Sequence, residues 1–313
     1  MSGPRLGHDP LETGVADHDV SPPAVLADAI DRLVAARPPL LLVADFDGTL
    51  APGSRDPGAA AIDPVAQRAL RVLARLGESR PARVRTVVLT GRTVLDVAAR
   101  VRVGGIEYLG DHGLQHGRMR RGGRATALRV RSEPGFERHG DPAERLATGV
   151  AAELHHPAWL FVERKGPSVA FHVRQASDVA VARDAVLTAI ATVEAREGLT
   201  DHGLVHYRGR SVVDLRPHDA GGKREAVTRL LDRERPGAVV VLGDELSDVD
   251  AFEAVHSARA GDPELVAITV AVHGSRPAPA ELSELADLHV GSARSVARFL
   301  TALARHLDTS RRP

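Results

Sequence analysis

The chain contains no cysteine and few aromatic residues. None of its 313 residues is Cys, which excludes disulfides, thiol catalysis and zinc–thiolate sites. The fold therefore needs no oxidising compartment, and we expect a cytoplasmic protein. No apolar run approaches the roughly 20 residues of a membrane span. The polar stretch at residues 1–22 has no apolar signal core and predicts a flexible tail.

The chain also lacks an excess of charge of one sign. It has 41 basic and 41 acidic residues, for a formal net charge of +0. Binding to nucleic acid or to an anionic membrane surface depends on a basic excess or patch, so the composition argues against a general binder of either kind. The arginines of RMRRGGR (118–124) alternate with glycine and predict a surface hairpin. The length allows one large domain or two medium ones.

What the chain does contain is an apolar run that ends in two carboxylates. Residues 40–50 read LLLVADFDGTL, and the run Leu40–Phe46 predicts a buried parallel strand. Asp45 and Asp47 would leave this strand on the same face, at the end where open α/β sheets bind ligands. Two such carboxylates repel each other and lose hydration unless a cation joins them, and Mg²⁺ favours hard oxygen ligands. A lone D-x-D fits a solvated turn better, but the full DFDGTL string is far more specific.

The order of elements predicts an α/β fold. Apolar runs alternate with helical patterns, which indicates a Rossmann-like parallel sheet covered on both faces. The expected strands cover residues 40–46, 84–89, 106–109, 238–242 and 266–272. Between about residues 118 and 216 the pattern changes to half-exposed strand pieces around an alanine-rich helix at 177–197. We therefore expect a discontinuous core, residues 23–116 and 217–313, interrupted by an α+β module at 117–216.

Three later motifs match what the first one needs. Thr90 follows a strand, and its hydroxyl with the backbone of Gly91 could hold phosphate oxygens, although T-G-R alone also fits a helix N-cap. Lys223 begins a helix after a Gly-Gly turn, where its ammonium could neutralise a phosphate, although a lone lysine there is usually solvated. Asp244 ends a strand and could complete the Mg²⁺ site. Asp248 lies in the first turn of the next helix, where a carboxylate suits the helix dipole as a cap or as support for the metal.

In this order the motifs resemble those of the haloacid dehalogenase-like phosphatases, and residues 38–300 resemble the trehalose-6-phosphate phosphatases of that superfamily. The resemblance rests on DFDGTL, GDHGLQ (110–115), VERKGPSVAFHVR (162–174), VVDLRP (212–217) and GDELSDVDAF (243–252). The chain departs from the family pattern at Asp111, Arg224, Glu245, Ser247 and Val249. The family more often has Asn, Gly, Asp, Thr and Glu, respectively, at these positions.

The resemblance implies a role for each motif. The first aspartate would be the nucleophile and the second the general acid/base. The expected catalytic residues are Asp45, Asp47, Thr90 and Lys223. The expected Mg²⁺ site consists of the side chains of Asp45 and Asp244, the carbonyl of Asp47 and the supporting carboxylate of Asp248.

The inserted module would be a cap of the kind that this family places between its second and third motifs. Thr90 and Lys223 are 133 positions apart (223 − 90), far more than a simple α/β crossover needs. A cap can close over the phosphate, exclude water and supply sugar contacts. The expected substrate contacts are Gly91, His112, Glu163 and Lys165. Glu163 and Lys165 would share a strand face, where the alternative is an exposed ion pair of little energetic value.

These inferences predict a Mg²⁺-dependent phosphatase that hydrolyses trehalose 6-phosphate through an aspartyl-phosphate. Its partners would be a small sugar phosphate and, metabolically, a trehalose-6-phosphate synthase, and it would be a monomer or weak dimer. One alternative is a phosphatase for another sugar phosphate, such as sucrose phosphate or a glycosyl-glycerate phosphate. A second alternative is a non-catalytic sugar-phosphate sensor or regulatory subunit, which Val249 and Asp111 motivate. The intact set Asp45, Asp47, Lys223 and Asp244 argues against a sensor.

Overall fold

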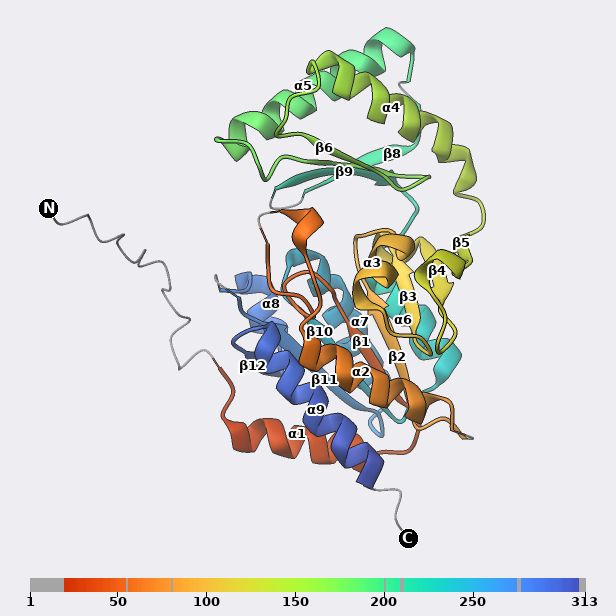
Figure 1. The fold of residues 1–313 in the computed structure, drawn as a ribbon, viewed down its shortest axis with the longest axis vertical. Coiled ribbons are helices and arrows are strands. Elements are labelled where there is room, and N and C mark those ends of the chain that lie inside the picture. Colours follow the sequence, from red (N-terminus) through yellow and green to blue (C-terminus); the bar gives the residue numbers. More distant parts are fainter. Residues whose placement is uncertain are drawn as a thin grey trace, which may run out of the picture.

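The computed structural model describes residues 20–54, 56–79, 81–199, 201–208, 211–274 and 277–309. Most of the predicted N-terminal tail lies outside these residues. Its last part is placed against the large sheet, because the Ser21 amide donates to the carbonyl of His289 and the Ser21 hydroxyl accepts from the His289 amide, both at 2.9 Å. The described chain forms two sheets, each with its own helices (Figure 1).

The larger sheet has eight strands in the order β12-β11-β10-β1-β2-β3-β4-β5. All neighbours from β12 to β3 are parallel, whereas β4 and β5 continue the sheet antiparallel. The strands are β1 (Leu40–Ala44), β2 (Val84–Leu89), β3 (Glu107–Gly110), β4 (Gln115–Arg118), β5 (Val130–Ser132), β10 (Ala238–Gly243), β11 (Val266–Val272) and β12 (Leu288–Val290). The strands β1 and β10 are buried along their whole length, as their continuous apolar runs require.

Helices cover both faces of this sheet. One face packs on α1 (Pro23–Ala35), α2 (Pro64–Gly77), α3 (Val94–Val101) and α9 (Ala293–Thr309). The other packs on α6 (Lys223–Glu234), α7 (Leu246–Gly261) and α8 (Ala280–Leu285). Side-chain N-caps fix where two of these helices begin. The Asp63 and Thr93 side chains accept hydrogen bonds from backbone amides in the first turns of α2 and α3. The α/β class predicted from the alternating pattern is confirmed.

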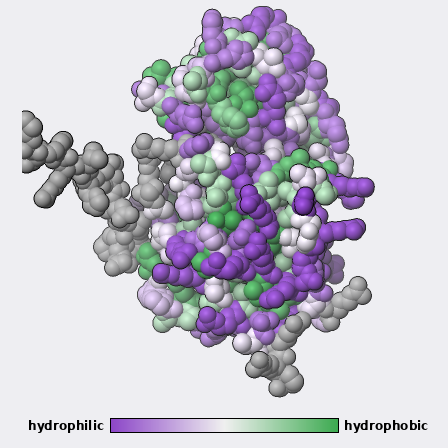
Figure 2. Space-filling model, in the orientation of Figure 1, coloured by the Kyte–Doolittle hydropathy of each residue, from purple (hydrophilic) through white to green (hydrophobic). Residues whose placement is uncertain are grey.

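The smaller sheet is antiparallel, in the order β6-β7-β9-β8. It contains β6 (Phe161–Arg164), β7 (Val169–His172), β8 (Leu204–Arg208) and β9 (Val212–Pro217), and it packs on α4 (Gly140–Glu153) and α5 (Val179–Glu197). We call these six elements the four-stranded unit. Figure 1 shows its helices on the outer side and its sheet facing the large sheet. Hydrophilic residues cover much of both units in the view of Figure 2, with smaller hydrophobic areas between them.

Two features differ from the sequence prediction. Helix α4 was not predicted, because Gly140, Pro142 and Gly149 interrupt a pattern whose apolar face, Leu146 and Val150 among others, is nevertheless buried. The change of pattern places residues 117–132 in the insert, but β4 and β5 pair with the large sheet. Half-exposed strands at the edge of a core sheet have the same pattern as strands of a separate module, so the pattern change alone does not locate the boundary.

Short 3₁₀ turns connect several of these elements, at Pro57–Ala59, Asp111–Gly113, Ala125–Ala127 and Glu137–His139. The Asp111–Gly113 turn follows β3, where both Asp111 and His112 have positive φ, 49° and 54°. A search of the described helices finds none with the length and apolar content needed to cross a bilayer.

Candidate active site

The carboxyl ends of three adjacent parallel strands meet at one edge of the large sheet. Strand β1 lies between β10 and β2, with Ala44 opposite both Leu242 and Val88. The next residues of each strand therefore gather at this edge: Asp45 after β1, Thr90 after β2 and Asp244 after β10. Parallel sheets place ligands at this edge. The sequence analysis expects these three residues at strand ends, and the structure places them there.

Lys223, at the start of α6, lies between two carboxylates of this edge. Its Nζ is 2.8 Å from Asp45 Oδ1 and 2.7 Å from Asp248 Oδ1. The three side chains are buried, with exposed fractions of 1% for Lys223, 4% for Asp45 and 2% for Asp248. A third carboxylate, that of Glu245, lies 3.9 Å from the same ammonium but is largely exposed. Charge-assisted hydrogen bonds of this length hold Lys223 and Asp45 in one orientation.

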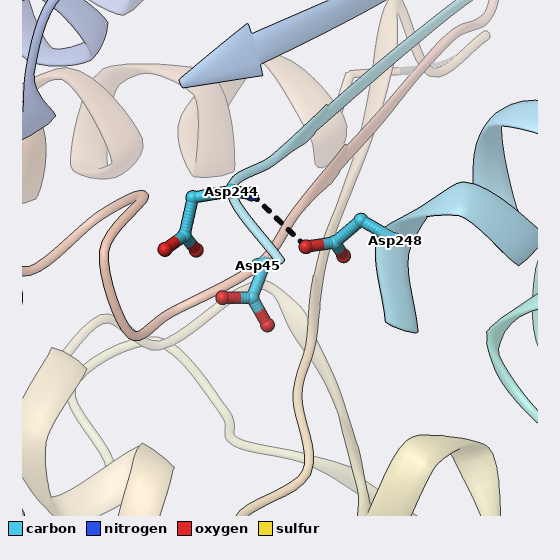
Figure 3. A group of neighbouring side chains, drawn as sticks. All are labelled: Asp45, Asp244 and Asp248. Carbon is cyan, nitrogen blue, oxygen red and sulfur yellow. Dashed lines mark hydrogen bonds between the residues drawn. The ribbon is translucent and has the colours of Figure 1, made fainter. Parts of the chain in front are cut away.

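Three aspartates form an acidic group around one point. Oxygen atoms of Asp45, Asp244 and Asp248 lie within 4.8 Å of one another, and Figure 3 shows their carboxylates converging from β1, β10 and α7. Asp248 also accepts from the amides of Asp244 and Glu245, at 3.0 and 3.1 Å. Both oxygens of Asp248 are thus engaged, which makes this residue a support for the loop, whereas Asp45 keeps Oδ2 and Asp244 keeps most of its capacity for another ligand.

Glycines allow the close approach of these segments. Gly48 has a φ of 84°, and a Cβ there would overlap the carboxylate of Asp244. A Cβ at Gly243 would likewise overlap Asp248. Gly48 is therefore required both by its positive φ and by the contact between the two loops, and Gly243 is required by the contact of its strand end with Asp248.

The electrostatics of the acidic group indicate a missing positive charge. Burial raises the pKa of Asp45 above its usual range, with Asp248 and Glu245 adding to the effect while Lys223 opposes it. Burial and then Asp45 raise the pKa of Asp244 in the same way. Burial acts to lower the pKa of Lys223, but the carboxylates of Asp248 and Asp45 outweigh it and raise that pKa. The single positive charge of Lys223 does not balance the three carboxylates of Asp45, Asp244 and Asp248.

The residues present fit a divalent cation. The acidic group offers hard oxygen donors, an aspartate with a free oxygen on each of two strand ends, and raised carboxyl pKa values that a cation would reverse. Thr49 donates to Asp244 Oδ1 at 3.3 Å and leaves the second oxygen of that carboxylate available. The Asp47 side chain does not belong to the group, which is compatible with the expectation that this residue contributes its carbonyl.

The Asp47 carboxylate instead pairs with Arg92. Arg92 Nε is 2.5 Å from Asp47 Oδ2 and Nη2 is 2.8 Å from Oδ1, a bidentate contact. Arg92 also donates to Asp96 at 2.8 Å, and Asp96 accepts from Arg100 on the same helix. The guanidinium of Arg92 lies 5.6 Å from the centre of the Phe46 ring. The arginine of T-G-R thus fixes the direction of Asp47, a role that sequence reasoning missed although the motif contained it.

Thr90 and Gly91 form the turn between β2 and α3. Thr90 is 1% exposed; its amide donates to Leu109 and its hydroxyl accepts from the amide of Arg92. Gly91 packs against His112, since a Cβ at residue 91 would lie 2.8 Å from the Nε2 of that imidazole. The amide of His112 donates to the carbonyl of Thr90 at 3.0 Å. The expected phosphate turn and the expected substrate residue His112 are therefore neighbours.

The remaining expected substrate residues, Glu163 and Lys165, lie on and just after β6 of the four-stranded unit. They share a face as predicted, with Lys165 Nζ 3.9 Å from Glu163 Oε2. The alternative of an exposed surface pair does not describe them, because Lys165 is 5% exposed. Asp214 Oδ1 lies 3.4 Å from the same ammonium, and Asp214 Oδ2 lies 3.5 Å from His112 Nε2.

Sequence reasoning missed three residues that lie close to Lys165 and His112: Asp214, Arg216 and Gln115. Asp214 and Arg216 lie two residues apart in V-V-D-L-R-P and so share a face of β9, a signal that could have identified them. Gln115 bridges the two units, since its amide donates to the carbonyl of Lys165 at 2.8 Å and its oxygen accepts from the amide of Val94 at 3.0 Å. Gln115 ends the motif GDHGLQ, but its bridging role depends on the fold and could not be read from that motif.

Comparison with known proteins assigns the family. A trehalose-phosphatase family model matches residues 150–286. The trehalose-phosphate phosphatase of Mycobacterium tuberculosis strain H37Rv is 35% identical over 238 residues, 72% of this chain and 53% of that protein. The Mycobacterium leprae trehalose-phosphate phosphatase is 30% identical over 324 residues, 98% of this chain and 67% of that protein. The chain spans about half the length of the first of these relatives.

Solved structures agree on the fold. The C-terminal domain of the Candida albicans trehalose-6-phosphate phosphatase matches with a TM-score of 0.67 at 19% identity, over 90% of this chain and 96% of that one. A haloacid dehalogenase-like hydrolase from Bacteroides thetaiotaomicron matches with a TM-score of 0.54 at 15% identity, over 84% of this chain and 98% of that one. The fold is haloacid dehalogenase-like, and the chain belongs to the trehalose-phosphate phosphatase family.

Proposed function

We propose that this chain is a cytoplasmic Mg²⁺-dependent phosphatase that hydrolyses trehalose 6-phosphate to trehalose and inorganic phosphate. The observation that carries the proposal is the buried Asp45 carboxylate at the edge of the parallel sheet, fixed by Lys223 at 2.8 Å and grouped with Asp244 and Asp248. A buried nucleophile, a cation beside it and an acidic group able to hold a metal are the parts that phosphoryl transfer through a carboxylate requires.

The reaction would proceed in two displacements. First, a carboxylate oxygen of Asp45 attacks phosphorus, the bond from phosphorus to the sugar oxygen breaks, and Asp47 gives a proton to that oxygen. Then Asp47 takes a proton from water, the water oxygen attacks the aspartyl-phosphate, and phosphate leaves with the Asp45 carboxylate restored. The bidentate contact with Arg92 suits Asp47 in the second displacement. Proton donation in the first requires Asp47 to leave that contact.

Other groups would stabilise the transferring phosphoryl group. The Lys223 ammonium and the Thr90–Gly91 turn lie at the same sheet edge and can donate to its oxygens. Asp45, Asp244 and the carbonyl of Asp47 would hold Mg²⁺, with Asp248 as support. When bound, the ion supplies positive charge that offsets the charge of the phosphate and of the buried carboxylates.

The four-stranded unit would act as the cap and read the sugar. Lys165 Nζ has carboxylates at 3.4, 3.7 and 3.9 Å, of which only the contact with Asp214 is a hydrogen bond. It therefore keeps donor capacity for sugar hydroxyls, and Glu163 and His112 offer acceptors beside it. The names of the relatives support trehalose as the sugar, and a trehalose-6-phosphate synthase would supply the substrate.

Phosphate release from a panel of sugar phosphates, with Mg²⁺ and with a chelator, tests the proposal. We expect trehalose 6-phosphate to give the highest kcat/KM and the chelator to abolish turnover. A much higher kcat/KM for sucrose phosphate or a glycosyl-glycerate phosphate would replace the substrate and keep the chemistry. Tight binding of the sugar phosphate with no turnover in Mg²⁺ would favour the sensor alternative instead.

A further inference from the structure

Three charged side chains form a row along the start of α3. Arg92 precedes this helix, and Asp96 and Arg100 follow at intervals of four residues, a spacing that places the three side chains on one side. Arg92 Nη1 and Arg100 Nε both donate to Asp96 Oδ2, each at 2.8 Å. The side chains of the two arginines are 12% and 19% exposed, and that of Asp96 is 33% exposed. We call these three residues the α3 charge row.

Both arginines of the row also hold the loop that follows β1. Arg92 donates to the Asp47 carboxylate from Nε at 2.5 Å and from Nη2 at 2.8 Å. Arg100 Nη1 donates to the carbonyls of Gly58 and Ala60, at 2.9 and 2.7 Å. The carboxylate between the two arginines is therefore a common anchor for the start of this loop and for its later part.

The direction of the Asp47 side chain depends on this row. Asp47 is 44% exposed, and within the part of the chain that the structure describes Arg92 alone donates to its carboxylate. The Gly48 amide donates to the carbonyl of Ala51 at 2.8 Å, which fixes the main chain of the turn but leaves the Asp47 side chain a choice of rotamers. The position of the Arg92 guanidinium therefore selects the rotamer of Asp47.

Asp96 is the charged anchor of Arg92 that takes no part in the reaction. Burial acts to raise the pKa of Asp96, but hydrogen bonds from Arg100 and Arg92 outweigh it and lower that pKa. The anchor is therefore an anion at neutral pH. Ion pairs four residues apart on an exposed helix usually contribute little to stability. This row differs from such pairs because its two ends bind a loop, and one of them binds Asp47.

We infer that Asp96 is a positioning residue for hydrolysis of the aspartyl-phosphate, because through Arg92 it holds Asp47 where this carboxylate meets the attacking water. In that displacement the water oxygen bonds to phosphorus, the bond from phosphorus to Asp45 breaks, and the proton of the water passes to Asp47. A reacting group misplaced by about 1 Å can cost about 10²-fold in rate. The first displacement should depend less on Asp96, because Asp47 leaves Arg92 to donate its proton. The inference deepens the proposed function and rests on it for the roles of Asp45 and Asp47.

The substrate 4-nitrophenyl phosphate separates the two displacements. Its 4-nitrophenolate leaves without needing a proton, so its release reports the first displacement and does not require a general acid. Release of phosphate reports the second displacement. Stopped-flow absorbance with Mg²⁺ at neutral pH measures the first turnover, and steady-state assays of both products give kcat and kcat/KM. This substrate has no sugar, so the test stands even if trehalose 6-phosphate is not the natural substrate.

We expect Asp96→Asn to slow the second displacement selectively. The variant should release a burst of about one 4-nitrophenolate per active site, larger than the burst of the wild type, and then turn over with a kcat about tenfold lower. Its kcat/KM should stay within about twofold of the wild type, because kcat/KM reports the steps up to the first displacement. Asp96→Glu keeps the charge and should lie closer to the wild type. Glu144→Gln, which removes the exposed ion pair to Arg164 within the four-stranded unit, is the matched control and should show wild-type kinetics.

The outcomes separate a positioning role from a structural one. Equal losses of kcat and kcat/KM without a burst would overturn the inference and make Asp96 a support of the fold. Wild-type kinetics in Asp96→Asn would also overturn it. If Asp96→Asn does not fold, Arg100→Gln removes the second donor to Asp96 and should give the same burst with a smaller loss of kcat, and wild-type kinetics there would count against the inference. A wild type that hydrolyses no phosphate monoester would refute the proposed function itself, an outcome distinct from all of these.

Discussion

The molecule contains two buried lysines among carboxylates, and they differ in how closely the carboxylates hold them. We call Lys223 with Asp45 and Asp248 the tight cluster, and Lys165 with Asp111, Glu163 and Asp214 the loose cluster. Lys223, at the large sheet, has two carboxylate oxygens at 2.7 and 2.8 Å. Lys165, in the four-stranded unit, has three at 3.4 to 3.9 Å. Both ammonium groups are almost fully buried. In the proposed reaction the short contacts would fix Asp45 and Lys223 in place, whereas the long contacts leave Lys165 with donors for a ligand.

Enzyme activity should be more sensitive to substitutions in the tight cluster than to substitutions in the loose cluster. Asp45→Asn keeps the shape of the nucleophile but removes its charge, so we expect kcat to fall by about 10⁴-fold or more, the scale of losing a covalent nucleophile. Steady-state phosphate release measures it, with circular dichroism to verify the fold. Wild-type activity in the purified variant would show that Asp45 is not the nucleophile and that the tight cluster is structural.

Lys223→Met tests whether the tight cluster also stabilises the fold. Removing one partner of a buried ion pair leaves the carboxylates uncompensated, at a cost of about 3–5 kcal/mol in the free energy of unfolding. We expect kcat to fall by about 10²–10³-fold as well, as when a charge-stabilising donor is lost. Urea unfolding and kinetics on the same preparation separate the two effects. High Mg²⁺ should recover part of the lost stability, and an unchanged unfolding midpoint would contradict the buried-pair description.

The corresponding change in the loose cluster should act on binding. Lys165→Met removes the charged donor that we propose binds the sugar, so we expect kcat/KM for trehalose 6-phosphate to fall by about 10–100-fold, mostly through KM. With p-nitrophenyl phosphate, which has no sugar hydroxyls, the same variant should be close to wild type. Equal losses on both substrates would mean that Lys165 supports the structure of the site without reading the sugar.

The two clusters also differ in how far the sequence predicts them. Asp45, Thr90, Lys223 and Asp244 each follow a buried strand or begin a helix, so a local pattern places them at one sheet edge. The Asp47–Arg92 pair joins two such ends, and its existence depends on rotamers that no pattern specifies. Asp111, Ser168 and Asp214 come from three separate segments that meet only because the β6–β7 hairpin packs on the turn after β3. The position of α4 was missed for a local reason, its helix-breaking residues, and tertiary packing overrides these.

The smallest expected effect concerns the pH dependence of the loose cluster, where two residues act in opposite directions. The pKa of Asp111 is raised to about 6, so its contribution to stability is lost as pH rises from about 4 to 6. The pKa of His112 is lowered to about 4, so its contribution is lost as pH falls from about 6.5 to 4. Each contribution is at most about 3 kcal/mol, and they offset each other between pH 4 and 6.

Asp111→Asn removes one side of this balance. We expect the variant to be more stable than the wild type at pH 7, because it buries no Asp111 charge. It should lose that advantage as the pH falls towards 4, because the wild type gains stability as Asp111 becomes protonated and the variant, in which only His112 titrates, does not. Urea unfolding of both proteins at pH 4.5 and 7 measures the difference, with Glu144→Gln as the control that leaves the cluster intact. A pH dependence identical to that of the wild type would mean that Asp111 and His112 do not titrate in this way. The contrast between the two lysine clusters would then rest on distance alone.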